Sequence, residues 1–242
     1  MRDNKKPLRS PCVLNRAHRH ANGLQACYLF NDNATKVWDF TRNGNTLDVT
    51  NATWVADGIQ FDANGKYAAL DNTNQIVHQN AGTLLFYIRS LSAFTDGTFR
   101  MIFGQLGAGY STGDFFIEKD VDDNLYFLIR DTGNHYITAV PSDFPNWQSG
   151  FMFGVHWDKN KTVHDSVNMA FSYNGNYINP TNKVNATTWD CTLKSTLHFG
   201  NDVGVTTRFF NGIFSHASIY SRVLNETELK NIYRKQYAKF IR

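Results

Sequence analysis

The stretch from residue 197 to residue 233 constrains the fold of this chain more than any other. It reads as a strand, a turn, a second strand and a helix whose start is marked by its residue types. Asn225 is a favourable N-cap, and Glu228 follows at the spacing at which the two side chains satisfy each other's free backbone amides. Leu229 and Ile232 then recur at helical spacing. The stretch therefore predicts a β-domain that ends in a short helix with one apolar face.

Short apolar runs separated by turn-forming residues fill most of the remaining chain, which is typical of an antiparallel β-protein. The run at 83–89 is apolar at successive positions, so we expect a central strand that is covered on both faces. Residues 121–124 form an acidic turn between two such runs. Asn174 and Gly175 lie between two further runs and predict a two-residue hairpin turn. With 242 residues and 14% aromatic side chains, the chain can bury a full core.

Ten residues of the closing stretch match a pattern of glycine-asparagine, a Phe-x-Gly-x strand, an Ile-Tyr-x-Arg-x-Leu step and an acidic helix start. They are Gly200, Asn201, Phe210, Gly212, Phe214, Ile219, Tyr220, Arg222, Leu224 and Glu228. In these residues the chain resembles laminin G-like domains, which belong to the concanavalin A-like lectin and glucanase group of β-sandwiches. Ser215 departs from the pattern, because the family carries aspartate there. The departure argues against any role that needs this carboxylate.

The opening of the chain resembles the subset of these domains that tailed bacteriophages encode. The matching residues are Asn15, Arg16, His18, Gly23 and Leu24 in the lead-in, then Phe30 and Asn31, and later Asp39, Asn43 and Gly44. Arg19 stands where the subset has proline, and Arg42 stands where it has glycine. In the middle of the chain, Trp157 with Asp158 fits the same family. The resemblance covers roughly residues 13–233.

Together, the residue patterns and the resemblance predict an all-β fold. We expect a single jelly-roll β-sandwich of two antiparallel sheets, with an N-terminal extended arm and a short C-terminal helix. The expected divisions are a basic arm at 1–22, the laminin G-like sandwich at 23–224 and an amphipathic basic helix packed on the sandwich at 225–242. Chain ends of such a sandwich tend to lie close together, so we expect arm and helix to share one docking surface.

Charge is distributed unevenly along the chain. Residues 1–22 carry a formal net charge of +5, residues 222–242 carry +4, and residues 23–221 carry −6. Basic ends on an acidic body can dock on a negatively charged surface. The alternative, which we regard as equally compatible with the charge pattern, is that the two ends are simply exposed to solvent. The basic docking patch that we expect consists of Arg2, Lys5, Lys6, Arg9, Arg16, Arg19, Lys230, Arg234, Lys235 and Lys239.

The cysteines indicate a reducing compartment. Cys12, Cys27 and Cys191 are odd in number and lack framework spacing, so we expect free thiols, with a bridge between Cys27 and Cys191 as the alternative. No signal-peptide core follows the basic start, and no apolar run approaches a membrane span. The sequence therefore predicts assembly in a host cytoplasm, without a signal peptide and without a membrane partner.

Two acidic residues on one predicted strand raise the question of catalysis. Glu118 and Asp120 lie two positions apart, so strand alternation directs both to the same face. Glucanases of the group carry Glu-x-Asp-x-x-Glu on such a strand, with the carboxylates acting in one cleft. Position 123 is an aspartate here, and the turn expected at 121–124 would move it out of the strand register. We therefore expect no catalytic residues.

Two further kinds of candidate site residue lie in loops. The resemblance implies calcium as the one candidate cofactor, and the hard oxygen ligands available are those of Asp71, Asn72, Asp122, Asp123 and Asp202. The same residue types form ordinary turns without any metal. Candidates for stacking on sugar rings are Tyr110, Trp147 and Trp189, for which core packing is the alternative.

These observations lead to three hypotheses about function. The first is a non-enzymatic phage virion accessory protein, either a capsid decoration or a fibre component on the virion surface. Its partners would be other capsid or tail proteins, together with host-surface glycans. The second is a glycan-binding lectin-type module, and the third is a glucanase-like hydrolase. A homo-oligomer is compatible with the first two, whereas a nucleic-acid partner is not expected.

Overall fold

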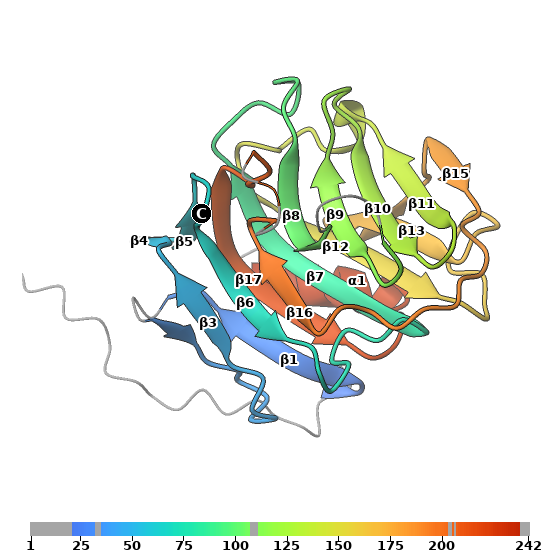
Figure 1. Cartoon of the computed structure of the whole chain (residues 1–242), viewed down its shortest axis with the longest axis horizontal. Coiled ribbons are helices and arrows are strands. Elements are labelled where there is room, and N and C mark those ends of the chain that lie inside the picture. Colours follow the sequence, from blue (N-terminus) through green and yellow to red (C-terminus); the bar gives the residue numbers. More distant parts are fainter. Residues whose placement is uncertain (1–20, 32–34, 107–110, 203–204, 206, 238–242) are drawn as a thin grey trace, which may run out of the picture.

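The computed structural model describes residues 21–31, 35–106, 111–202, 205 and 207–237 of the chain. In these residues, two antiparallel sheets stack face to face as a jelly-roll β-sandwich, and one short helix lies on the outside (Figure 1). We name the eight-stranded sheet A and the nine-stranded sheet B. Figure 1 is viewed with sheet B in front, and with α1 behind it. The expected fold class is confirmed.

Sheet A lies on the helix side of the sandwich. It comprises β1 (Leu24–Leu29), β4 (Thr53–Val55), β5 (Gly58–Phe61), β7 (Ala81–Ser90), β12 (Phe151–Asp158), β13 (Met169–Tyr173), β14 (Asn176–Ile178) and β17 (Gly212–Tyr220). The strand order is β14-β13-β12-β7-β17-β5-β4, and β1 pairs with the second half of β17.

Sheet B forms the other layer. It comprises β2 (Lys36–Val37), β3 (Leu47–Thr50), β6 (Tyr67–Asp71), β8 (Arg100–Gln105), β9 (Phe115–Lys119), β10 (Leu125–Arg130), β11 (Asn134–Ala139), β15 (Asn182–Val184) and β16 (Thr196–Phe199). The order is β15-β11-β10-β9-β8-β16-β6-β3-β2. The helical segments are η2 (Pro141–Asp143), α1 (Glu226–Ile232) and a π-helical turn, η3 (Tyr233–Tyr237).

Aromatic rings fill the space between the two sheets. The rings of Phe103 and Phe199 in sheet B have centroids 4.7 Å apart. Across the core, the ring of Phe86 in sheet A meets Phe199 edge-on at 6.1 Å. All three side chains are fully buried. Burial of one such large side chain contributes roughly 1.5–3 kcal/mol, so apolar packing is what joins the sheets.

Strand β7 is buried on both of its faces, as the apolar run at 83–89 predicted. Leu84 and Phe86 point into the core between the sheets. Leu85 and Tyr87 point outward and belong to a second apolar cluster, which α1 covers. The strand is central in sheet A, between β12 and β17. This double burial explains why its sequence lacks polar alternation.

The C-terminal helix begins with the expected capping box. The Asn225 side chain accepts a hydrogen bond from the Glu228 backbone amide at 3.0 Å, and Glu228 accepts one from the Asn225 amide at 3.1 Å. Leu229 and Ile232 are buried against the outer face of sheet A, where Met152 belongs to the same cluster. The cap and the apolar face of the helix are therefore confirmed.

Some sequence expectations fall at the limits of the described residues. Residues 1–20 of the expected arm, including Cys12, and residues 238–242 of the expected helix lie outside them. Cys27 on β1 and Cys191 before β16 both carry free thiols, so the bridge between them is not formed. In the described part of the chain, no helix has the length and apolar character needed to span a membrane.

Candidate functional site

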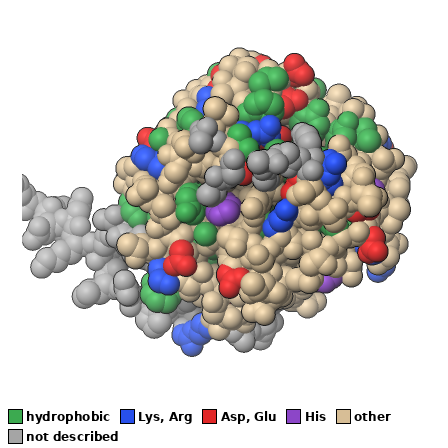
Figure 2. All heavy atoms as spheres, in the orientation of Figure 1, with side chains coloured by type: hydrophobic (Ala, Val, Ile, Leu, Met, Phe, Trp, Pro, Cys, Tyr) green, Lys and Arg blue, Asp and Glu red, His purple; other side chains and the backbone are tan. Residues whose placement is uncertain are grey.

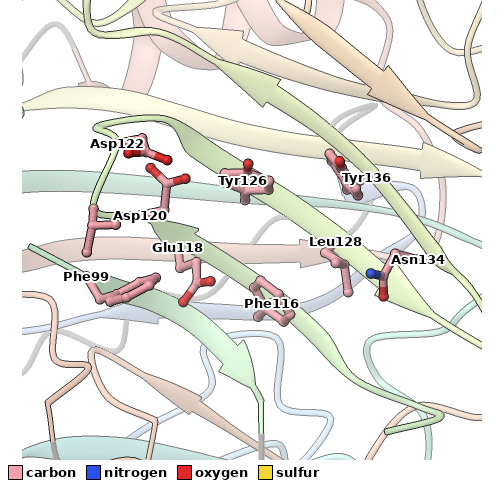
Figure 3. A pocket seen from close by; sticks show the side chains of 10 residues that line it. Phe99, Phe116, Glu118, Asp120, Asp122, Tyr126, Leu128, Asn134 and Tyr136 are labelled. Carbon is pink, nitrogen blue, oxygen red and sulfur yellow. The ribbon is translucent and has the colours of Figure 1, made fainter. Parts of the chain in front are cut away.

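A groove of about 340 Å³ crosses the outer face of sheet B, over β9, β10 and β11. Its lining residues are Phe99, Phe116, Glu118, Asp120, Val121, Asp122, Tyr126, Leu128, Asn134 and Tyr136. Figure 3 shows the carboxylates of Glu118, Asp120 and Asp122 toward one end of the groove, and Leu128, Asn134 and Tyr136 toward the other. One end of the groove is therefore acidic, and the other end presents apolar side chains and one side-chain amide.

Strand alternation places these side chains on the outside of the sandwich. On β9, Phe115 and Ile117 belong to the core between the sheets, so Phe116 and Glu118 point the other way. The register then sets Glu118 directly opposite Tyr126 on β10. The antiparallel pairing of three neighbouring strands thus brings together residues that are distant in sequence.

Glu118 is the most deeply buried acid of the groove, with 4% of its surface exposed. Its Oε2 accepts a hydrogen bond from Arg208 Nη1 at 2.8 Å, and the Arg208 guanidinium lies 4.2 Å from the centre of the Phe99 ring. Burial raises the pKa of Glu118 to about 7, the charges of Asp202 and Asp120 act in the same direction, and Arg208 opposes them. A carboxylate whose pKa is shifted in this way is a reasonable marker of a functional site.

Asp120 is the residue that follows β9 and starts the turn to β10. Its Oδ1 accepts a hydrogen bond from the Asn124 amide at 2.8 Å, and its side chain lines the groove. Burial, followed by the charge of Asp120, raises the pKa of Tyr126 to about 12. The Tyr126 phenol therefore stays protonated at neutral pH and can donate a hydrogen bond.

The turn from β9 to β10 is held by a buried lysine. Lys119 is fully buried, and its Nζ lies 2.9 Å from Asp96 and 2.6 Å from Asp123. Asp123 has a positive φ of 60° and also accepts a hydrogen bond from the Gly97 amide at 3.0 Å. The Asp123 carboxylate is thus directed away from the groove, and the glucanase-type set of three carboxylates is not assembled. The predicted loss of strand register at this turn is confirmed.

Aromatic rings supply most of the apolar surface of the groove. Tyr126 and Tyr136 stand on adjacent strands with ring centroids 5.3 Å apart, tilted by 45°. Both are partly exposed, as is Phe99, whereas Phe116 and Leu128 are buried beneath them. The groove therefore offers ring faces above a solid apolar floor.

The aromatic residues predicted to stack on sugars are not in this groove. Trp147 and Trp189 are only 4% and 2% exposed and belong to the core, which corrects the expectation for both. Trp147 packs against Phe94 with ring centroids 4.5 Å apart, and Trp189 donates a hydrogen bond to the Gln79 carbonyl at 2.6 Å. Their segments are loops, but the loops fold inward over the edges of the core. Tyr110 lies outside the described residues.

The residues considered for calcium are dispersed. Asp71 pairs with Thr196 at the start of β16, whereas Asp202 follows the end of that strand. Asn72 is buried and bonds to backbone groups of Val77, in an ordinary turn. Asp122 is exposed on the groove rim and Asp123 is paired with Lys119, as described above. The described residues contain no group of three or more His, Cys, Asp or Glu side chains placed to hold a metal. The five expected ligands therefore do not form one site.

The described part of the basic patch is confined to the helix. Lys230 forms an ion pair with Glu226 at 3.0 Å, and Arg234 and Lys235 are exposed. The other expected members lie outside the described residues: Arg2, Lys5, Lys6, Arg9, Arg16, Arg19 and Lys239. A shared surface of arm and helix stays a prediction.

Sequence reasoning identified the acidic end of the groove but missed its aromatic residues. Residues 125–130 form β10, and the alternation of this strand separates the buried Phe127 from the partly exposed Tyr126. The signal that could have found the groove is the outward tyrosine of a strand next to an acidic strand. What no local signal shows is that β11 lies beside β10 and adds Tyr136.

No known protein-family model and no curated protein sequence matches this chain. The receptor-binding domain of a botulinum neurotoxin C/D mosaic serotype is similar in structure, with a TM-score of 0.68, 11% identity, and coverage of 88% of this chain and 51% of that one. The botulinum neurotoxin serotype D ligand-binding domain in complex with N-acetylneuraminic acid has a TM-score of 0.67, 13% identity, and coverage of 88% and 51%.

A sialidase from Trypanosoma rangeli in complex with sialic acid has a TM-score of 0.64, 15% identity, and coverage of 88% of this chain and 33% of that one. This chain thus spans between a third and about half of the length of these proteins. At such identities the likeness shows the fold alone, a β-sandwich of two antiparallel sheets. The laminin G and phage resemblance of the sequence stays a prediction.

Proposed function

We propose that this chain is a glycan-binding, lectin-like module and that the groove on sheet B is its binding site. The proposal rests on one observation: the partly exposed rings of Tyr126 and Tyr136 line the same cavity as the carboxylates of Glu118 and Asp120, which can accept hydrogen bonds. Ring faces stack on the apolar faces of sugars, and carboxylates accept hydrogen bonds from hydroxyl groups. The groove volume of about 340 Å³ falls within the roughly 300–1,000 Å³ of small-ligand sites.

Two of the similar structures, a neurotoxin domain and a sialidase, were solved with sialic acids bound, and this supports a sugar ligand as the class to test first. The support comes from the shared fold, because the identities are 13% and 15%. The site itself is argued from the side chains of this chain.

Replacement of Tyr126 by alanine tests the proposal. The change removes a ring from the groove without entering the core, so we expect at least about a tenfold loss of affinity for whichever glycan binds on an array, measured by calorimetry. Trp38→Ala is the matched control, because Trp38 is an aromatic residue 51% exposed on the opposite edge of sheet B. Equal affinity of the wild type and the Tyr126→Ala variant would contradict the assignment of the groove.

We further propose that the groove binds without hydrolysing. One observation favours the hydrolase: Glu118, with its pKa raised to about 7, resembles a general acid beside a second carboxylate, Asp120. Against it, Glu118 is held by Arg208, and the third carboxylate, Asp123, is bound to Lys119. Release of new reducing ends from a bound oligosaccharide, abolished by Glu118→Gln, would overturn this part of the proposal.

Attachment to a phage virion is a second, separable proposal. It is supported by the basic ends on an acidic body, with net charges of +5 and +4 against −6. Glycan binding and virion attachment are compatible, because the groove is on sheet B and α1 is on the outer face of sheet A. Under this proposal, deletion of residues 1–20 abolishes copurification with particles while the sandwich stays folded.

A further inference from the structure

The charges of the groove indicate which glycans it selects. Three of its lining residues, Glu118, Asp120 and Asp122, are acids, and none of the ten is a lysine, arginine or histidine. Figure 2 shows hydrophobic and acidic side chains at the top of this face of the molecule, with Lys or Arg side chains beside them. A ligand in the groove is therefore in contact with negative charge.

The cation described at the acidic end of the groove is already engaged, and Arg130, toward the other end, donates a hydrogen bond to the lining residue Asn134. Arg208 donates to Glu118 at 2.8 Å and stacks over Phe99 at 4.2 Å, so its charge offsets that of a single carboxylate. Lys119 does not supply a second positive charge to the groove. Its Nζ bonds to the backbone carbonyl of Asp120 and to the carboxylates of two other residues. In the described part of the chain, no lysine or arginine forms an ion pair with the carboxylate of Asp120 or Asp122. Two negative charges are left for the ligand to meet.

We propose that the groove selects glycans that carry no negative charge and discriminates against sialylated ones. The inference rests on the proposed function and deepens it. It separates this chain from the two similar structures that hold sialic acids, whose fold it shares at 13% and 15% identity. A carboxylate brought close to Asp120 and Asp122 is repelled, whereas hydroxyl and amide groups donate hydrogen bonds to the same oxygens.

The test uses matched glycans with and without a terminal sialic acid, first on an array and then by calorimetry on the strongest pair. We expect the sialylated member to bind at least about tenfold more weakly, from the repulsion of like charges a few ångströms apart near a protein surface. The ratio of the two affinities, unsialylated over sialylated, should decrease when the salt concentration rises from about 20 mM to about 300 mM, because exposed charges are screened.

A double variant, Asp120→Asn with Asp122→Asn, assigns the effect to these two carboxylates. Asparagine keeps the acceptor for the Asn124 amide, so the turn is preserved while both charges are lost. We expect the ratio between the two glycans to fall to about threefold or less. Asp48→Asn, which removes an exposed charge from β3 outside the groove, is the matched control and should leave the ratio unchanged.

The outcomes separate the inference from the proposed function. A ratio near one in the wild type, or tighter binding of the sialylated member, overturns the inference and leaves glycan binding in place. An unchanged ratio in the double variant also overturns it, provided that thermal unfolding shows the variant to be folded. Failure of every glycan on the array to bind overturns the proposed function itself.

Discussion

Glu118 combines burial with three neighbouring charged groups, and this combination has a consequence for stability. Burial is the largest cause that raises its pKa from 4.5 to about 7, so folding disfavours the ionised carboxylate. A raised folded-state pKa means that the contribution of Glu118 to stability is fully present below pH 4.5 and is lost as pH rises through 7. Between pH 5 and pH 8 the loss amounts to roughly 2 to 3 kcal/mol.

Glu118→Gln removes this titration. Compared with the variant, the wild type should lose free energy of unfolding as pH rises from 5 to 8, as measured by urea denaturation at each pH. Any constant cost of leaving Arg208 without a charged partner cancels in this comparison, because it is present at every pH. Parallel stability profiles for the two proteins would show that Glu118 has the same pKa folded and unfolded.

The limits of sequence reasoning are clearest at single residues. Glu118 and Asp120 could be placed on one face from their spacing alone, because strand alternation is a local rule. Trp147 and Trp189 could not be placed, because their burial depends on contacts with residues far away in the sequence, such as Phe94 and Gln79. A tryptophan in a loop has the same local pattern whether the loop folds inward or outward.

At the level of elements, sequence reasoning succeeded where a local rule fixes the geometry. The capping box of α1 and the central position of β7 were predicted from spacing and composition. The turn at Asn174 and Gly175 was predicted as well, and both residues have the positive φ that a two-residue hairpin needs, 48° and 88°. The order of the strands within each sheet was not predicted, because it depends on the pairing of strands that are distant in the sequence.

The Asn174 and Gly175 turn also determines how α1 docks. A Cβ on Gly175 would stand 3.0 Å from the Cα of Lys230, so the helix backbone lies directly against the turn. Gly44 has a similar positive φ of 85°, but nothing lies within 4 Å of its Cβ position. Alanine at either position pays the conformational cost of positive φ, roughly 1–2 kcal/mol, and alanine at 175 must also displace the helix.

We therefore expect Gly175→Ala to lower the free energy of unfolding by at least about 1 kcal/mol more than Gly44→Ala, since overpacking typically costs about 1–3 kcal/mol. Urea denaturation of both variants measures the difference. Equal costs would mean that α1 does not rest on the turn.

For the whole molecule, buried histidines predict a loss of stability in acid. Burial lowers the pKa of His156 to about 3 and the pKa values of His198 and His216 to about 4, from an ordinary 6.5. The unfolded chain binds these protons below pH 6.5 and the folded chain does not, so the stability present above pH 6.5 is lost as pH falls toward 4. From pH 7 to pH 5 each histidine costs about 2 kcal/mol, and the three together, about 6 kcal/mol, exceed the opposing gain of about 2 kcal/mol from protonation of Glu118.

His156 is the sharpest test, because it lies between the hydroxyl groups of Thr83, at 3.1 Å, and Ser172, at 2.9 Å, with no exposed surface. His156→Gln replaces it with a side chain that cannot titrate but can still bond to hydroxyl groups. The stability advantage of the wild type over this variant should shrink by about 2 kcal/mol between pH 7 and pH 5 in urea denaturation. A constant difference across this range would mean that His156 takes up its proton equally in the folded and unfolded chain, and the acid loss would then have to come from His198 and His216.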